Sequence, residues 1–137
     1  MLGALGVCLT LAAAPQLPAR FVPVRGFTLA WTHSIEKIRW EEDYIVQADA
    51  AGQPTLIAGH ARILGSGAGM DPPPGAVHRA DGWYEYQPRT PPLKILRLTR
   101  SPYTADYDWC VRGHCEPLRA IMPTDGDVTL LRPCRAP

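Results

Sequence analysis

Residues 27–35 read FTLAWTHSI and alternate between large apolar and small polar side chains. One face of this segment would carry the apolar side chains together with one histidine: Phe27, Leu29, Trp31, His33 and Ile35. Alternation with a period of two over this length is typical of a β-strand with one buried face. This segment is the clearest predicted strand of the chain.

Residues 38–46 repeat the pattern and place Glu42 among apolar side chains. A tight turn at residues 36–37 would pair His33 with Trp40 and leave Glu42 diagonal to His33 on the same face. We expect His33 and Glu42 to form a buried polar pair, because buried polar groups require partners. A ligand or metal role for the pair is the alternative.

Further short strands are predicted along the rest of the chain, at residues 55–64, 82–86, 93–99, 107–111, 114–118 and 128–132. The chain has 15 prolines and 12 glycines, which break long helices and favour short strands joined by turns. The sequence therefore predicts an all-β fold. We expect one small antiparallel β-sandwich or partly open barrel of about seven to eight short strands.

Composition narrows the possible partners. Apolar residues make up 46% of the chain and charged residues 20%, which is ordinary for a globular protein. The 14 basic and 13 acidic residues give a net charge of +1 and form no long run of one sign. We therefore expect neither nucleic-acid binding nor strong lipid binding.

The N-terminal residues resemble an export signal. Residues 2–14 form an uncharged apolar run that is shorter than the roughly 20 residues needed to span a bilayer. Small residues follow, so we predict a signal peptide over residues 1–19, cleaved after Ala19 or after Ala14, and a single domain over residues 20–137. The expected location is the periplasm. The alternatives are a first buried strand and, less favoured, lipidation at Cys8.

The cysteines support export. Cys110 and Cys115 bracket four residues, and a two-residue turn at residues 112–113 would place the two sulfurs on one face of a hairpin. Facing positions lie within disulfide reach, so we predict a Cys110–Cys115 bridge. Cys134 would then stay free or bond another chain, or it would pair with one of the two instead. A zinc site that includes His114 is a less favoured reading.

His33, Ser34 and Glu36 supply the residue types of a nucleophilic enzyme. On a regular strand His33 points to the face opposite Ser34 and Glu36, because successive side chains alternate. The three side chains cannot converge without a bulge. We therefore expect no catalytic residue and a non-enzymatic protein, with a serine hydrolase based on Ser34 as a minor alternative.

A glycine-rich loop follows the third predicted strand. Residues 65–70 read GSGAGM and precede Asp71 and three prolines, without the Lys-Ser/Thr ending of a phosphate-binding loop. Loops this long in small domains often bind partners. We take Gly67, Gly69 and Asp71 as candidate ligand- or partner-binding residues, together with Trp83 on the strand that follows. Four residues earlier in the chain complete this candidate set: His33, Ser34, Glu36 and Glu42.

Five motifs taken together suggest a family: residues 32–37 (THSIEK), residues 40–42 (WEE), residues 65–70 (GSGAGM), Tyr107, and the Cys110–Cys115 pair. In this combination the chain resembles the domain of unknown function 1850 family. The resemblance covers most of the chain after residue 19. It implies a small exported bacterial protein, of a kind often encoded beside the membrane components of transporters that take up organic acids.

The resemblance implies a periplasmic accessory protein of a tripartite ATP-independent periplasmic (TRAP) transporter of the TAXI type. The expected partner is the membrane subunit or the solute-binding subunit of that transporter. The resemblance implies no catalytic residue and no cofactor, so His33, Glu36 and Glu42 are motif positions only. A stand-alone ligand- or metal-binding module that uses His33, Glu42 and Asp71 is the alternative function.

Overall fold

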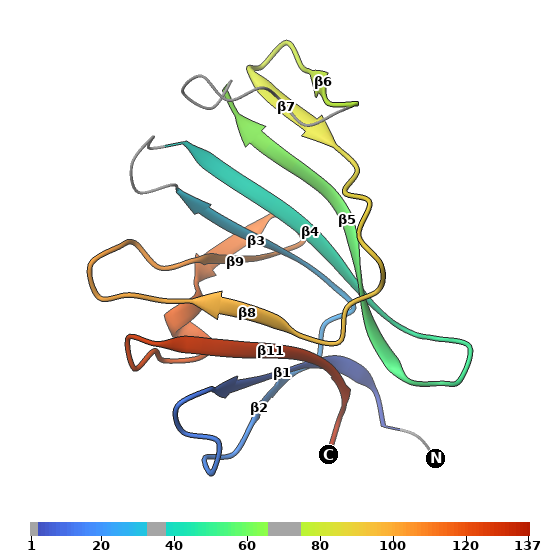
Figure 1. Cartoon of the computed structure of the whole chain (residues 1–137), viewed down its shortest axis with the longest axis vertical. Coiled ribbons are helices and arrows are strands. Elements are labelled where there is room, and N and C mark those ends of the chain that lie inside the picture. Colours follow the sequence, from blue (N-terminus) through green and yellow to red (C-terminus); the bar gives the residue numbers. More distant parts are fainter. Residues whose placement is uncertain (1–2, 33–37, 66–74) are drawn as a thin grey trace.

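The computed structural model describes residues 3–32, 38–65 and 75–137. Two antiparallel sheets face each other in an open sandwich that does not close into a barrel (Figure 1). The smaller sheet has the order β2-β1-β11-β8. Its strands are β2 (Arg20–Val22), β1 (Leu5–Leu11), β11 (Val128–Arg135) and β8 (Leu96–Thr99).

The larger sheet has seven strands in the order β10-β9-β3-β4-β5-β7-β6. These are β10 (His114–Pro117), β9 (Asp108–Val111), β3 (Gly26–Thr32), β4 (Arg39–Ala48), β5 (Pro54–Leu64), β7 (Trp83–Tyr86) and β6 (Val77–His78), with a short 3-10 helix η1 (Leu118–Ala120) after β10. The predicted fold class, an all-β antiparallel sandwich, is confirmed.

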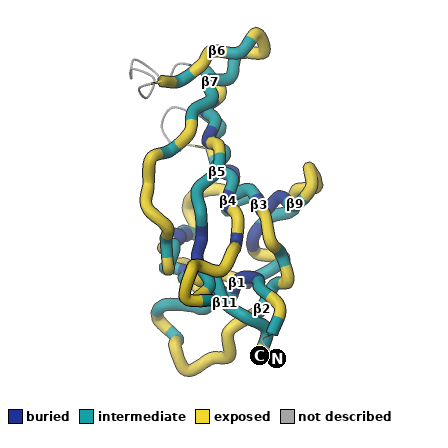
Figure 2. Tube along the Cα trace, turned by 90° about the vertical axis from the view of Figure 1, so that its right-hand side faces the viewer, coloured by how far each residue is buried: buried dark blue, intermediate teal, exposed yellow. Residues whose placement is uncertain are grey.

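The core lies where β3, β4 and β5 cross the smaller sheet. Its fully buried side chains come from both sheets and from η1: Val7, Leu9, Val46, Leu56, Leu118 and Leu131. The end of the larger sheet that carries β6 and β7 projects away from this core (Figure 2). The inner face of the larger sheet therefore continues beyond the area that the smaller sheet covers.

The predicted hairpin between β3 and β4 forms in a shifted register. The sequence predicted that His33 pairs with Trp40, but the structure pairs Trp31 with Trp40 and Leu29 with Glu42. A shift of two residues leaves every side chain on its predicted face, because the pleat repeats every two residues. Residues 33–37, which contain the predicted turn, lie outside the described part of the chain.

Residues 5–11, the predicted core of a signal peptide, form β1 inside the fold. β1 pairs with β11 on one side and with β2 on the other, and Val7 and Leu9 are fully buried. A disulfide joins Cys8 to Cys134. The structure thus favours the alternative reading, in which these residues form a first buried strand. The expectation that Cys134 stays free, bonds another chain or pairs with Cys110 or Cys115 is wrong. Processing at Ala14 or Ala19 stays a prediction.

The second disulfide is the predicted one. Cys110 and Cys115 face each other across β9 and β10 and are bonded. Arg112 and Gly113 form the turn with φ angles of 53° and 78°, which a two-residue type I′ hairpin turn requires.

Two disulfides indicate an oxidising, extracellular-type environment. In the described residues, no helix is long and apolar enough to cross a membrane.

Peptide mapping without reduction distinguishes the two readings of residues 5–11. We expect the protein purified from its own host to give a peptide with Cys8 bonded to a peptide with Cys134, because β1 supplies buried core side chains. The measurement is mass spectrometry of a non-reduced digest. A mature N-terminus at Pro15 or Arg20 would contradict this expectation and support cleavage.

Candidate functional site

Glu42 lies in a row of side chains that crosses five strands on the inner face of the larger sheet. The strand pairings place the row in this order: Trp109, Leu29, Glu42, Ala61 and Tyr86. Leu29 and Ala61 are buried, whereas Glu42 and Tyr86 are half-buried. The carboxylate thus extends from a central strand of the sheet and has short or apolar neighbours on both sides.

Aromatic rings surround this carboxylate. Five residues, which we call the aromatic cluster, lie along β3, β4, β7 and the segment before β9: Trp31, Trp40, Tyr44, Tyr86 and Tyr107. The Trp31 and Trp40 rings are nearly parallel, with centroids 6.2 Å apart, and the Tyr107 ring meets Trp31 edge-on at 5.9 Å. The buried indole Nε1–H of Trp40 has no hydrogen-bond partner among the described residues.

Burial controls the ionisation of this region. It raises the pKa of Glu42 above the ordinary value, although the Tyr44 hydroxyl opposes this by donating a 3.1 Å hydrogen bond to Oε1. Burial, together with the nearby Glu42 charge, raises the pKa values of Tyr44, Tyr86 and Tyr107. These tyrosines are therefore neutral at physiological pH. Within the described residues, no basic side chain forms an ion pair with Glu42.

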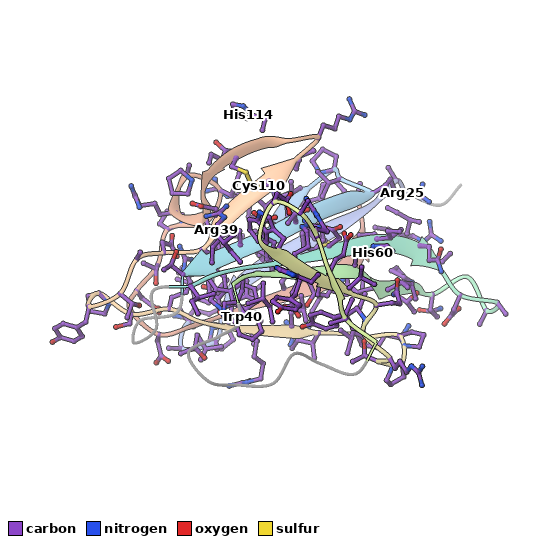
Figure 3. All side chains as sticks on the ribbon, turned by 90° about the horizontal axis from the view of Figure 1, so that it is seen from above. Arg25, Arg39, Trp40, His60, Cys110 and His114 are labelled. Atoms are coloured by element: carbon purple, nitrogen blue, oxygen red, sulfur yellow. A yellow bond between two sulfur atoms is a disulfide. The ribbon has the colours of Figure 1, made fainter. Side chains whose placement is uncertain are left out.

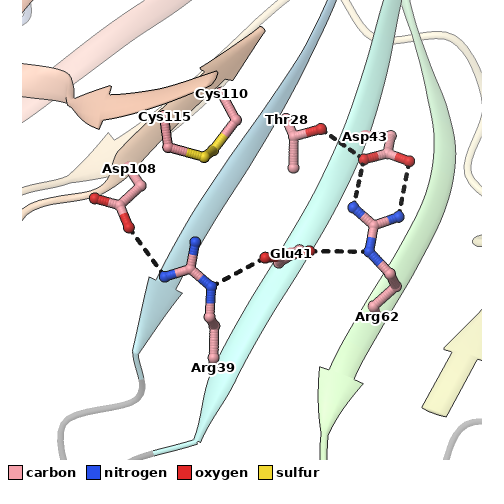
Figure 4. Close-up of a disulfide and its surroundings, with 8 residues drawn as sticks. All are labelled: Thr28, Arg39, Glu41, Asp43, Arg62, Asp108, Cys110 and Cys115. Atoms are coloured by element: carbon pink, nitrogen blue, oxygen red, sulfur yellow. Dashed lines mark hydrogen bonds and ion pairs between the residues drawn. A yellow bond between two sulfur atoms is a disulfide. The ribbon is translucent and has the colours of Figure 1, made fainter. Parts of the chain in front are cut away.

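The outer face of the same strands carries a network of ion pairs (Figure 4). We call it the ionic network, and it consists of Thr28, Arg39, Glu41, Asp43, Arg62 and Asp108. Arg39 donates hydrogen bonds to Asp108 at 2.9 Å and to Glu41 at 3.0 Å. Arg62 donates to Glu41 at 3.0 Å and to both carboxylate oxygens of Asp43 at 2.9 Å. Every charge in this network has an opposite partner.

The ionic network favours the ionised form of Asp43. Burial alone would raise the pKa of Asp43, but the hydrogen bonds from Arg62 and from the Thr28 hydroxyl, which donates at 2.7 Å, outweigh burial and lower it. The register between β4 and β5 shifts at Asp43, between Glu42 and Tyr44, and Gly59 lies next to Asp43 there. A Cβ on Gly59 would come within 3.3 Å of the Asp43 Cβ, so a side chain there would crowd Asp43.

A groove of about 710 Å³ opens on the outer face beside the β9–β10 hairpin. The Cys110–Cys115 disulfide and Arg112 line the hairpin side, and His60 and Arg62 line the β5 side. Figure 3 shows Cys110 and Trp40 on opposite sides of the sheet. The larger sheet therefore has two distinct faces, an outer one with paired charges and an inner one with the aromatic cluster and Glu42.

The structure tests only part of the predicted site. Glu42 lies on the apolar face, as predicted. Trp83 pairs with Leu64 on the outer face, so it does not join Glu42. The remaining predicted binding residues lie outside the described part of the chain: His33, Ser34, Glu36, Gly67, Gly69 and Asp71.

The alternative prediction of a zinc site at the hairpin is wrong, because the sulfurs of Cys110 and Cys115 form a disulfide. In residues 3–32, 38–65 and 75–137, no three His, Cys, Asp or Glu side chains are grouped so that they could hold a metal ion.

Sequence reasoning missed the residues that complete the environment of Glu42. Tyr86 comes near it only because β7 pairs with β5 in a register that aligns Tyr86 with Ala61, next to Glu42. Tyr107 comes from the segment before β9, 65 positions along the chain, and contacts Trp31. The available signal was the unusual carboxylate in an apolar strand face, which marked Glu42 but not its neighbours.

These features define an all-β sandwich with two disulfides and with a sheet face that carries aromatic rings and a carboxylate. The chain belongs to the family described as "Domain of unknown function (DUF1850)", whose model matches residues 27–118. The match runs from β3 to the first residue of η1 and includes the aromatic cluster and the ionic network. No curated protein and no solved structure gave a significant match.

Replacing Glu42 with glutamine should stabilise the isolated protein at pH 7 by about 1 kcal/mol, because the change removes a desolvated charge and keeps the shape. A carboxyl whose folded pKa is raised binds its proton more tightly in the folded state, so its ionisation lowers stability as pH rises between the unfolded and folded pKa values. The gain should vanish below about pH 4, where Glu42 is protonated in both states.

The measurement is thermal unfolding of the wild type and Glu42→Gln at pH 7 and at pH 4. Glu85→Gln is the matched control, because Glu85 lies on the outer face of the same sheet, on β7, near Arg62 and Arg79. It should not raise the melting temperature. A lower melting temperature for Glu42→Gln at pH 7 would show that Glu42 is a structural partner rather than a group held for binding.

Proposed function

We propose that this protein is a non-enzymatic periplasmic accessory protein of a TRAP transporter of the TAXI type, and that it binds the membrane or solute-binding subunit through the aromatic cluster. The observation that carries the proposal is the aromatic cluster around Glu42 on the inner face of the larger sheet, in which every ring except that of Tyr44 is half-buried. The transporter class comes from the family resemblance.

The composition of the aromatic cluster supports binding to a protein. Tryptophan and tyrosine are enriched among the residues that contribute most to protein–protein affinity. Trp31, Trp40, Tyr86 and Tyr107 are each only half-buried, so they retain surface for a partner. The ionic network on the reverse side connects β4 to β5 and to β9. A rigid sheet of this kind reduces the ordering cost of association.

The disulfides support the proposed compartment. Both join residues within the described fold, and protein disulfides persist in the periplasm of bacteria but are rare in the cytosol. Export by a signal peptide is part of the proposal. Whether the exported chain keeps β1 is decided by the peptide mapping described above.

A stand-alone ligand-binding module is the second candidate, and the groove on the outer face favours it. Its volume of about 710 Å³ lies within the range of small-molecule sites. Arg112, His60 and Arg62 would suit an anionic ligand, although Arg62 is already paired with two carboxylates. Saturable stabilisation of the protein by carboxylates or divalent metals would favour this candidate over the first.

Co-purification tests the proposed function. The tagged protein is isolated from gently crosslinked membranes of its own host, and the bound proteins are identified by mass spectrometry. We expect a transporter subunit with the wild type and with Trp83→Ala, whose side chain lies on the outer face. Trp40→Ala should lose that subunit. Recovery of no transporter component with the wild type would contradict the proposal.

A further inference from the structure

We propose that Glu42 and the aromatic cluster form a subsite for a basic side chain of the partner, the guanidinium of an arginine or the ammonium of a lysine. This inference rests on the proposed function, because it names the group by which the partner is recognised. It is argued from the position of Glu42, from its charge and from the rings around it.

The side chains next to Glu42 on its own strand are aromatic, and the one beside it on β5 is short. On β4, the residues two positions away on the same face are Trp40 and Tyr44, about 6–7 Å distant along the strand. On β5 the neighbour is Ala61, whose methyl group is short, and Tyr86 follows on β7. The carboxylate and the Tyr86 ring thus face each other across an alanine.

A cation would stabilise the negative charge of Glu42. A partly buried carboxylate is unfavourable unless an opposite charge or hydrogen bonds compensate it. The described residues supply one side-chain hydrogen bond, from Tyr44. Tyr44, Tyr86 and Tyr107 have raised pKa values and are neutral at physiological pH, so their hydroxyl groups carry no charge that would compensate Glu42. An incoming guanidinium or ammonium group would supply a positive charge opposite the Glu42 carboxylate.

The rings add affinity for a cation in particular. A cation over the face of a tryptophan or tyrosine is attracted by the negative charge of the ring face, and arginine also stacks on aromatic planes. Trp31 and Trp40 lie on the same face as Glu42, in the adjacent row of the sheet. The combination of a carboxylate with tryptophan and tyrosine rings therefore selects a cationic group over a neutral or anionic one.

The other carboxylates of these central strands do not compete for the cation. Glu41 and Asp43, which flank Glu42 in sequence, point to the outer face and are bonded to Arg39 and Arg62. Glu42 differs from them because the pleat turns it to the side where the described residues include no arginine partner. A basic side chain that reaches this sheet would therefore be directed to Glu42.

The test uses the isolated full chain and three small probes: N-propylguanidinium chloride, n-butylammonium chloride and neutral N-propylurea. The ionic strength is matched with sodium chloride. The readout is the indole N–H signals in a ¹H–¹⁵N correlation spectrum. Trp31 and Trp40 report on the subsite, and Trp83 on the outer face of the sheet is an internal control.

We expect the two cations to shift the Trp31 and Trp40 signals saturably, with dissociation constants below about 100 mM, and to leave the Trp83 signal unchanged. N-propylurea should produce no saturable shift. Glu42→Gln should weaken binding of the cations at least fivefold, whereas Glu85→Gln should leave it unchanged.

Equal shifts with the neutral probe, or no saturable shift with either cation, would overturn the inference. The result is separate from the test of the proposed function, because no transporter component is present. If co-purification succeeds and the cations do not bind, the accessory role stands and the subsite is wrong. If the cations bind and nothing co-purifies, the subsite stands and the accessory role is wrong.

Discussion

Replacing both Cys8 and Cys134 with serine is expected to lower the free energy of unfolding by about 4–5 kcal/mol, because the bridge closes nearly the whole chain. The two cysteines are 126 residues apart. In the chain-entropy model, a disulfide stabilises a protein by restricting the unfolded ensemble, and the effect grows with the length of the closed loop. The bridge also fixes β1 against β11, where Val7, Leu9 and Leu131 are fully buried.

The second disulfide is the matched control for this prediction. Cys110 and Cys115 are only 5 residues apart, so their replacement by serine should lower the free energy of unfolding by about 2 kcal/mol. Urea unfolding of both double variants provides the measurement. If the Cys8/Cys134 variant lost no more stability than the hairpin variant, β1 would not belong to the stable fold.

Replacing Asp106 with asparagine is expected to cost about 3–5 kcal/mol, because it leaves the buried Arg100 guanidinium without its counter-charge. The Arg100 side chain is 1% exposed and that of Asp106 is 11% exposed. Asp106 accepts two hydrogen bonds from Arg100, at 3.0 and 2.8 Å, and a third from the Arg119 backbone N–H. Arg100 also donates to the Met122 carbonyl and to the buried Thr129 hydroxyl.

An exposed ion pair is the matched control for this variant. Arg79 and Asp81 also form a close pair, but both side chains are largely exposed to solvent. Solvent screens such pairs, so Asp81→Asn should leave the urea midpoint within experimental error of the wild type. A similar result for Asp106→Asn would mean that the Arg100–Asp106 pair does not anchor η1 to the smaller sheet.

The sequence predicted most of the larger sheet because its strands carry a local signal. The alternation in residues 27–32 and 39–46 marks both the strands and their buried faces, and the structure confirms these faces. The register was not predictable to the residue, because it depends on how the connecting turn is built. Since a shift of two residues preserves the faces, Glu42 was still assigned to the correct side.

The predicted signal peptide over residues 1–19 and the strand β1 rest on the same local pattern. A short uncharged apolar run satisfies both a signal-peptide core and a strand that is buried between two others. The long-range bridge from Cys8 to Cys134 would have distinguished them, but no local pattern connects residues so far apart. The Cys110–Cys115 bridge was predictable because a two-residue turn places its partners opposite each other.

The candidate site was predictable only through its central residue. A carboxylate on an apolar strand face is conspicuous in a sequence, and this marked Glu42. Its aromatic neighbours come together through the pairing of β5 with β7 and through the segment before β9. Those contacts are set by the order of strands in the sheet, which the sequence did not determine.

The most direct test of the proposed function compares the two faces of one strand. Tyr86 and Trp83 are both half-buried aromatic residues of β7, but Tyr86 belongs to the aromatic cluster and Trp83 lies on the outer face. A photoreactive phenylalanine derivative, p-benzoylphenylalanine, is placed at one position or the other in the protein expressed in its own host. After irradiation, crosslinked products are identified by mass spectrometry.

The account predicts that the derivative at position 86 crosslinks to a membrane or solute-binding subunit of a TRAP transporter, and that the derivative at position 83 does not. Crosslinks to such a subunit from position 83 alone, or from neither position, would contradict the claim that the aromatic cluster binds the transporter.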